Sequence, residues 1–357
     1  MIQIPVMKPK LASFEEIAPL LQRIDQSHIY SNHGPLVRDL EEEYSKYFNV
    51  EKKLVVALAN ATQAIQGLVS ISKNKNWIVP DYTFSATGLA VLNANRNLHI
   101  CDVNLDDWKI NINLISREQK EFGILPVMPF GSRIDFNPYQ DFEDVIIDAA
   151  ASLGAAPPVF SGMKKNWSVV YSLHATKVLG AGEGSIVVCG NEAQADSLRA
   201  WSNFGFSADR TSDIQGTNAK MSEMNAAYGL YSVQNMTQEN AEWLRSQEIV
   251  STQSKKYPWT TFVNSHPQFH PYWIVSFKDK QEKSLVVEKL EVAKVQSREW
   301  WAKPLSLQKA FSESCSSMLN GNAKQLSEVH LGLPMYRGLS SKDVQKICDV
   351  IHSAISN

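Results

Sequence analysis

Short apolar runs alternate with helix-length segments along the first half of the chain, and this alternation constrains the fold most. Runs that are apolar from end to end are typical of strands buried on both faces of a parallel sheet. Because segments long enough for a helix separate them, we predict an α/β fold with helices on both faces of a mainly parallel sheet. The predicted strands cover residues 54–58, 77–80, 98–103, 122–127, 145–148 and 185–189.

Helical periodicity and a change of character suggest two domains. Apolar residues recur at helical spacing in segments 14–29, 36–48, 221–243 and 341–355. Beyond about Arg245 the pattern becomes that of a smaller α/β unit, with a strand over 267–277, a helix over 286–296 and a polar, serine-rich connection over 306–325. We therefore predict a large domain, residues 1–244, and a small C-terminal domain, residues 245–357.

The charge and cysteine content argue against several classes of protein. The 357 residues carry 35 basic and 37 acidic side chains, a net charge of −2 without a long single-sign run. This balance gives no support to nucleic-acid binding or to a membrane surface. The N-terminus lacks a signal-peptide core, no apolar run has the length of a membrane helix, and the four cysteines are far apart. We expect reduced thiols and a cytoplasmic protein.

An acid and a lysine are the most informative candidates for a site. Asp148 closes a buried apolar run, and ligands of open α/β sheets bind at such strand ends. Lys177 follows 29 residues later, which leaves room for one crossover and a return to the same edge of the sheet. Pyridoxal phosphate needs a lysine for its Schiff base and a carboxylate for its ring nitrogen. We therefore predict that these two residues hold pyridoxal phosphate, although most lysines are simply solvated.

Three further positions fit this cofactor, each with an ordinary structural alternative. Ala61 and Thr62 open a helix after a short strand, where free N–H groups bind phosphate well; a plain helix cap is the alternative. Phe84, just past another strand, is placed to stack on a ring or to fill the core. Ser172 offers a hydroxyl to phosphate or to its own backbone.

Other kinds of site are disfavoured. The glycines between Gly180 and Gly184 follow the spacing G-x-G-x-G before a strand, which does not match a dinucleotide fingerprint. His174 has no partner at metal-ligand spacing, so we predict no metal site.

The order of these motifs resembles the DegT/DnrJ/StrS family of sugar-nucleotide aminotransferases. This resemblance implies the fold type I architecture, with a seven-stranded sheet in the large domain. It spans nearly the whole chain and is carried by segments 34–35, 40–41, 60–64, 80–87, 148–150, 172–177, 182–184, 203–205, 216–223 and 333–339.

The resemblance implies a role for each site residue. Lys177 would hold the cofactor and shuttle a proton, Asp148 would pair with the ring nitrogen, and Phe84 would stack on the ring. Ala61, Thr62 and Ser172 would bind the phosphate. Asn218 would reach the phosphate of a second subunit, so the protein would be a homodimer with its sites at the interface. A lysine rather than a histidine at position 177 argues against the dehydratases of the family.

The resemblance also implies a reaction, the transfer of an amino group from an amino acid, probably glutamate, to a keto-sugar nucleotide. The context of Asn32 favours C4 of a dTDP-linked 4-keto-6-deoxy sugar, in the synthesis of an amino sugar for surface polysaccharide. Amination at C3, UDP- or GDP-sugars, another use of the cofactor, or a non-catalytic sugar-nucleotide binder remain alternatives. Arg199, Trp301 and Lys303 are further substrate candidates, each equally explained as a surface or core residue.

One position departs from the family pattern. Ala151 stands where relatives commonly have Gln or His close to the ring hydroxyl of the cofactor, and Ser152 follows it. Alanine cannot donate that hydrogen bond, so either another group supplies it or the electronics of the cofactor differ.

Overall fold

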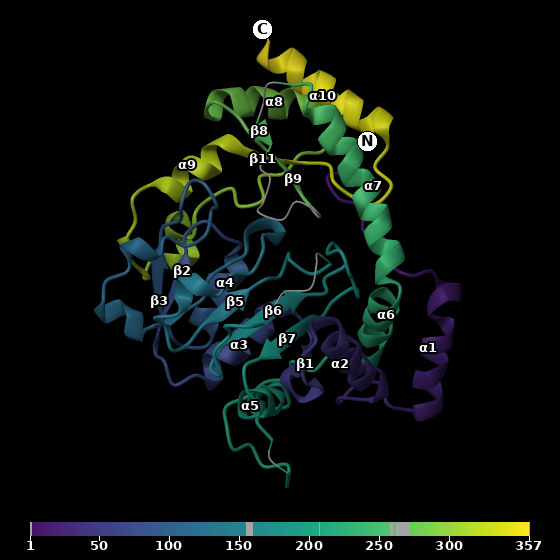
Figure 1. Cartoon of the computed structure of the whole chain (residues 1–357), viewed down its shortest axis with the longest axis vertical. Coiled ribbons are helices and arrows are strands. Elements are labelled where there is room, and N and C mark those ends of the chain that lie inside the picture. The colour runs from purple at the N-terminus through teal and green to yellow at the C-terminus, as the bar shows by residue number, and fades with distance from the viewer. Residues whose placement is uncertain (1, 155–159, 207, 258–259, 262–270, 357) are drawn as a thin grey trace.

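A computed structural model describes residues 2–154, 160–206, 208–257, 260–261 and 271–356 (Figure 1). Its central feature is a mainly parallel sheet. Two four-stranded sheets, ordered β1-β7-β6-β5 and β10-β3-β2-β4, are joined by parallel bridges between Ile124 and Val145 and between Val127 and Asp148. Within this sheet only β7 runs antiparallel to its neighbours, among the strand pairs of the described residues. The strands are β1 (Val55–Leu58), β2 (Asn76–Pro80), β3 (Asn97–Cys101), β4 (Gly123–Ile124), β5 (Ile146–Asp148), β6 (Ser168–Ser172), β7 (Ser185–Cys189) and β10 (Cys315–Met318).

The apolar strands bury both of their faces, as their sequences predict. Within β1, Val55 and Ala57 join one hydrophobic cluster and Val56 and Leu58 join the other. Alternate side chains of a strand point to opposite faces, so helices must cover both. One face packs against α2 (Pro35–Phe48) and α6 (Glu223–Gln234), and the other against α3 (Ala61–Ile71), α4 (Ser85–Asn93) and α5 (Glu192–Ser202).

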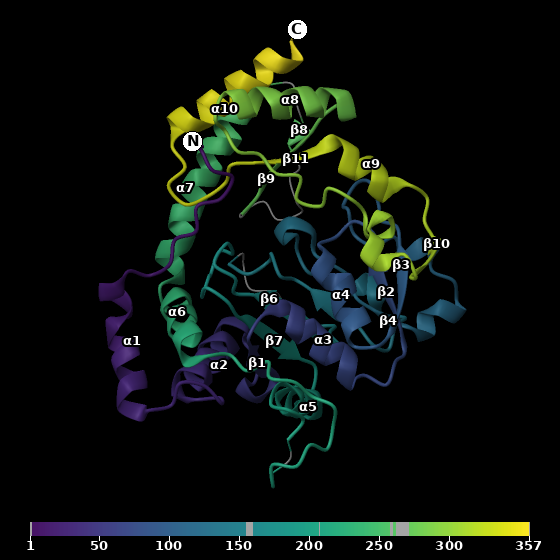
Figure 2. The same cartoon turned by 180° about the vertical axis from the view of Figure 1, so that it is seen from behind.

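A smaller unit stands beside the large one. The antiparallel strands β8 (Thr260–Thr261), β9 (Trp273–Ser276) and β11 (His330–Leu333) lie close to α8 (Lys280–Val292), α9 (Asn322–Val329) and α10 (Ser341–Ile355) (Figures 1 and 2). The long helix α7 (Met236–Ser254) runs from the large unit to the small one. The predicted domain boundary after residue 244 falls within this unbroken helix, so the division stays a prediction.

Two segments far apart in the sequence tie the two units together. Near the N-terminus, Ile4 pairs with Val295 of the small unit, before α1 (Phe14–Ser27) packs against α6. The strand β10, from the C-terminal part of the chain, pairs with β3 at the edge of the large sheet. The buried carboxylate of Asp102, just past β3, accepts hydrogen bonds from its neighbour Val103 and from four backbone N–H groups at the start of α9, those of Asn320, Gly321, Asn322 and Ala323.

Some sequence-based predictions of elements were wrong. The helix expected over 221–243 is two helices, because the chain departs from helical geometry at Asn235 between α6 and α7. The polar segment 306–325 is no simple connection, since it contains β10 and the start of α9. The prediction of a strand over 267–277 lies partly outside the described residues, and its remainder contains β9. Within the described residues, no helix is long and apolar enough to cross a membrane.

Candidate active site

Strand register brings two of the predicted site residues, Asp148 and Ser172, to one edge of the sheet. Leu58, Ser185 and Ser172 are directly paired across β1, β7 and β6. Asp148 ends β5 and pairs with Val170, two residues before Ser172. The C-terminal ends of β1, β5 and β6 therefore open onto the same edge, where ligands of such sheets bind.

The Asp148 carboxylate is a buried acidic group at this edge of the sheet. Only 7% of the residue is exposed, and burial raises the pKa of its carboxyl group. The backbone N–H of Ala150 and the hydroxyl of Thr87 donate hydrogen bonds to it, at 3.1 and 2.9 Å, and these bonds oppose the shift. Lys177 lowers the same pKa through its charge. The acid and the lysine are therefore in electrostatic reach of each other, and their predicted roles toward the cofactor stay predictions.

Lys177 is held at the end of a tight turn. Its backbone N–H bonds the carbonyl of His174, and the N–H of Ala175 bonds the carbonyl of Gly182. Gly182 has a φ of 83°, a left-handed conformation that favours glycine, which explains the glycine-rich loop behind the turn. The Nζ atom of Lys177 donates to the hydroxyl of Tyr272 at 3.0 Å. The amine thus meets a group of the small unit.

The N-terminus of α3 supplies bare donors. Asn60 caps the helix and accepts a hydrogen bond from the N–H of Gln63 at 2.9 Å. The N–H groups of Ala61 and Thr62, in the first turn, have no carbonyl partner within the helix and point out of its end. Together with the helix dipole, they form a site suited to phosphate. Ser172 ends β6, which lies two strands away from β1 in the sheet. Its hydroxyl accepts a hydrogen bond from the N–H of His174 at 3.2 Å.

Phe84 stands at the start of α4 as an uncovered aromatic side chain. It is 62% exposed, whereas the core alternative requires a buried ring. One turn later on the same helix, Thr87 holds the carboxylate of Asp148. The first turn of α4 thus contributes both an open ring face and a bond to the acid.

Asn218 and Asn32 lie on exposed segments of the large unit. Asn218 pairs with Asn203 through an isolated bridge, and its neighbour Ala219 accepts a hydrogen bond from the N–H of Ala59, next to the start of α3. Asn32 has a φ of 65° and precedes α2. Both side chains are available to a ligand or a second subunit, and their predicted roles stay predictions.

The other substrate candidates differ in their surroundings. Arg199 binds within its own subunit, donating to the carbonyl of Val55 at 2.7 Å and lying 3.6 Å from Glu41, which favours the structural alternative for this residue. Trp301 stacks on Phe130 with ring centroids 4.3 Å apart, in an aromatic cluster that also includes Tyr272. The exposed Lys303 is linked to the start of α4, because its carbonyl binds Gln308, which in turn accepts from Ser85.

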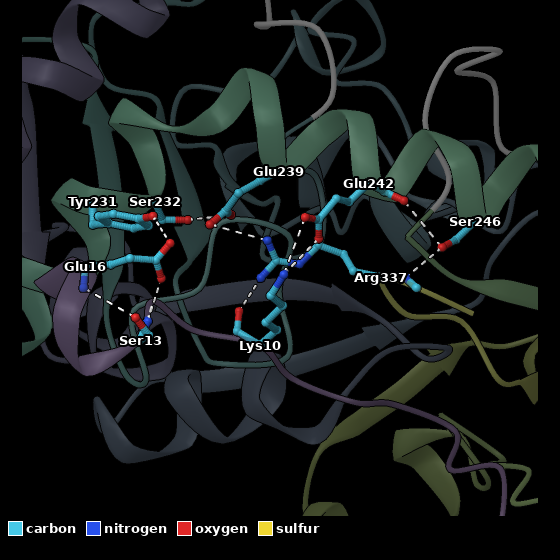
Figure 3. A network of polar contacts seen from close by, with 10 residues as sticks. Lys10, Ser13, Glu16, Tyr231, Ser232, Glu239, Glu242, Ser246 and Arg337 are labelled. Carbon is cyan, nitrogen blue, oxygen red and sulfur yellow. Dashed lines mark hydrogen bonds and ion pairs between the residues drawn. The ribbon is translucent and has the colours of Figure 1, made fainter. Parts of the chain in front are cut away.

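A polar network forms one wall beside the lysine. A hollow next to Lys177 is lined by the N-terminal segment, α7 and the stretch 335–337. There the Arg337 guanidinium lies 3.4 Å from the Glu239 carboxylate and also bonds the carbonyl of Lys10 (Figure 3). Because both side chains of this ion pair are about nine-tenths buried, it fixes the C-terminal stretch against α7.

These residues fit pyridoxal phosphate, judged by the donors and charges that the structure brings together. A buried carboxylate with raised pKa suits a protonated ring nitrogen, and the free N–H groups suit a phosphate. The sequence interpretation missed two contacts, the bonds of Thr87 to Asp148 and of Tyr272 to Lys177. A hydroxyl one turn after Phe84 was a local signal for Thr87, whereas Tyr272 had none, because its partner is 95 residues away in the chain.

Comparisons with known proteins agree with this architecture. A model of the DegT/DnrJ/EryC1/StrS aminotransferase family matches residues 12–352. The dTDP-4-amino-4,6-dideoxy-D-glucose transaminase of Shigella dysenteriae is 30% identical to this chain over 246 residues. The match spans 65% of that protein and 65% of this chain.

Solved structures extend the likeness to the whole fold. A putative PLP-dependent aminotransferase from Bacillus cereus superposes with a TM-score of 0.88 at 24% identity, covering 98% of this chain and 99% of that one. The structure of DesI in the presence of its TDP-sugar product gives 0.87 at 24% identity, over 99% of this chain and 93% of that one. Fold type I, predicted from the sequence, is thereby confirmed.

Proposed function

The chain belongs to the DegT/DnrJ/EryC1/StrS aminotransferase family, and we propose that it transfers an amino group from an amino acid to a keto-sugar nucleotide. Aminotransferases of this family use pyridoxal phosphate. The observation that supports the proposal is the placement of three features at one edge of the sheet: the buried Asp148 at the end of β5, Lys177 just after β6, and the N-terminus of α3 just after β1.

Each residue has a defined task in this proposal. Bound pyridoxal phosphate supplies an aldehyde that reacts with amines and a ring that accepts an electron pair. The Nζ of Lys177 holds the cofactor and then moves a proton to and from the substrate carbon. Asp148, fixed by Thr87, keeps a proton on the ring nitrogen. The exposed ring of Phe84 would stack on the ring of the cofactor.

The finer proposal concerns substrates and assembly. The donor is L-glutamate and the acceptor is C4 of a dTDP-linked 4-keto-6-deoxyhexose, for an amino sugar of surface polysaccharide made in the cytoplasm. A relative named dTDP-4-amino-4,6-dideoxy-D-glucose transaminase supports this choice, and Asn32 is exposed, so its side chain is available to the substrate. The active form is a homodimer, in which the exposed Asn218 of one subunit binds the cofactor phosphate of the other.

Two steps test the proposal separately. First, the purified protein is mixed with pyridoxal phosphate and then with glutamate alone, while the absorption spectrum is recorded. We expect a visible band that glutamate removes, and no such band in Lys177→Ala. A band that survives glutamate would favour another use of the cofactor, such as dehydration or racemisation.

Second, the aminated protein is incubated with dTDP-, UDP- and GDP-linked keto-sugars, and the products are identified by mass and by the position of the new amine. We expect amine at C4 of the dTDP-sugar. Amination at C3, or of a UDP- or GDP-sugar, would refute the finer proposal alone. Tight binding of a nucleotide sugar with no amination at all would instead favour a non-catalytic binder. Ala151, where relatives commonly have Gln or His, is the residue that raises this alternative.

A further inference from the structure

The Lys177 amine donates a hydrogen bond to the hydroxyl of Tyr272. The Nζ atom donates to this oxygen at 3.0 Å and lies 5.7 Å from the centre of the phenol ring. Tyr272 immediately precedes β9 of the small unit, whereas Lys177 follows β6 of the large sheet. The bond therefore joins the two units at the atom on which the chemistry depends.

The phenol ring is itself clamped. Its centroid lies 5.4 Å from that of Phe130 and 5.3 Å from that of Trp300, both in edge-to-face arrangements. Phe130 in turn stacks on Trp301 at 4.3 Å. Such pairs prefer defined geometries, so the cluster fixes the ring and aims its hydroxyl.

The ring of Pro271, directly before the tyrosine, packs against the large unit. A Cβ atom placed on Gly131 would lie 2.8 Å from the carbonyl oxygen of Ala151 and 3.4 Å from the ring of Pro271. Segment 130–131, Ala151 and the approach to Tyr272 therefore pack against one another on the same side of the site. A lysine side chain has four rotatable carbon–carbon bonds and is flexible on its own. Here the Lys177 amine is bonded to the hydroxyl of Tyr272, whose ring is held by its aromatic neighbours.

We propose that Tyr272 is a positioning residue for Lys177. Its hydroxyl accepts a hydrogen bond from the amine while the amine is not bonded to the cofactor, and so keeps Nζ aimed at the edge of the sheet that holds Asp148. No covalent bond of the tyrosine changes. This inference rests on the proposed role of Lys177 as the cofactor-bearing residue. A displacement of about 1 Å at a reacting group costs about a hundredfold in rate, so loss of the bond lowers the rate by about tenfold to a hundredfold.

The substitution Tyr272→Phe tests this because it removes the oxygen and keeps the ring. Tyr82→Phe is the matched control, because Tyr82 belongs to the same aromatic cluster, with its ring centroid 4.9 Å from that of Trp301. Removal of the Tyr82 hydroxyl should leave every rate unchanged. The first readout is the rate at which apoprotein captures pyridoxal phosphate covalently, followed by absorbance. The second is kcat and KM for the amino donor and the nucleotide sugar.

We expect Tyr272→Phe to slow covalent capture and kcat by about tenfold to a hundredfold, with KM for the nucleotide sugar unchanged. In a Lys177→Ala background, adding Tyr272→Phe should leave the affinity for pyridoxal phosphate unchanged, because the hydroxyl acts only through the lysine. A lowered affinity there would overturn the inference, since the tyrosine would then contact the cofactor directly.

The remaining outcomes are equally decisive. If Tyr272→Phe captures the cofactor and turns over like the wild type, the hydroxyl positions nothing and the inference fails. If its melting temperature falls well below that of Tyr82→Phe, the hydroxyl is structural and the inference also fails. Both results differ from a failure of the proposed function, in which the wild-type protein itself would show no glutamate-dependent change of spectrum.

Discussion

Replacing Thr87 by valine removes one of the two described donors to the Asp148 carboxylate while keeping the shape of the side chain. The hydroxyl donates to Asp148 at 2.9 Å in a buried setting, and the N–H of Ala150 remains as the other donor. A hydrogen bond to a charged group contributes about 1.5–3 kcal/mol. We therefore expect Thr87→Val to lower the free energy of unfolding of the apoprotein by about 2 kcal/mol at neutral pH.

The sign of the pH dependence follows from the direction of the pKa shift. Burial raises the pKa of Asp148, so the ionised carboxylate costs stability in the folded protein. This cost is absent below the ordinary pKa of the acid, where the group is neutral in both states, and it is complete above the raised pKa. Without the Thr87 hydroxyl the pKa of Asp148 rises further. The variant therefore loses free energy of unfolding relative to the wild type at neutral pH, and this difference shrinks as the pH falls to about 4.

Urea unfolding of apoprotein, followed by tryptophan fluorescence at one protein concentration, measures this effect at both pH values. Thr83→Val is the matched control, because its hydroxyl lies 3.1 Å from that of Thr87 and bonds a neutral partner. It should lower the free energy of unfolding by about 1 kcal/mol at either pH. The reasoning is refuted if Thr87→Val loses the same free energy at both pH values, or no more than the control.

Three further experiments test assembly and packing. Mixed and reassociated subunits of the inactive variants Lys177→Ala and Asn218→Ala should regain about a quarter of wild-type activity, since each mixed dimer has one intact site; no recovery would show that the asparagine acts within its own subunit. Asp102→Asn places an amide among five backbone N–H donors and should lower the free energy of unfolding by about 3 kcal/mol in urea titrations. Arg337→Met leaves the buried Glu239 unpaired and should cost about 3–5 kcal/mol, part of which the double variant Arg337→Met with Glu239→Leu recovers; equal losses in the two would count against the pair.

Local patterns predicted those parts of the fold that local physics decides. The helix expected over 341–355 is α10, because its apolar stripe lies within the segment and its capping residue, Ser340, directly precedes it. The run ending at Asp148 is β5, because a strand buried on both faces must be apolar throughout.

The misses involve partners far away in the sequence. The strand β10 has a polar sequence and forms only because β3, more than two hundred residues earlier, offers a free edge. The break at Asn235 carries neither glycine nor proline, so periodicity alone continued the helix through it. Arg199 was a substrate candidate with a structural alternative, and its partners, the carbonyl groups of Lys53 and Val55 and the carboxylate of Glu41, favour that alternative but could not be seen from the local sequence.

Borohydride reduction of the protein mixed with pyridoxal phosphate, followed by peptide mass mapping, tests the central claim most directly. Reduction fixes the cofactor to whichever amine holds it. We expect the label on Lys177, at one cofactor per chain, and its disappearance when glutamate is added before reduction. A label spread over surface lysines, or no label on the peptide that contains Lys177, would contradict the account.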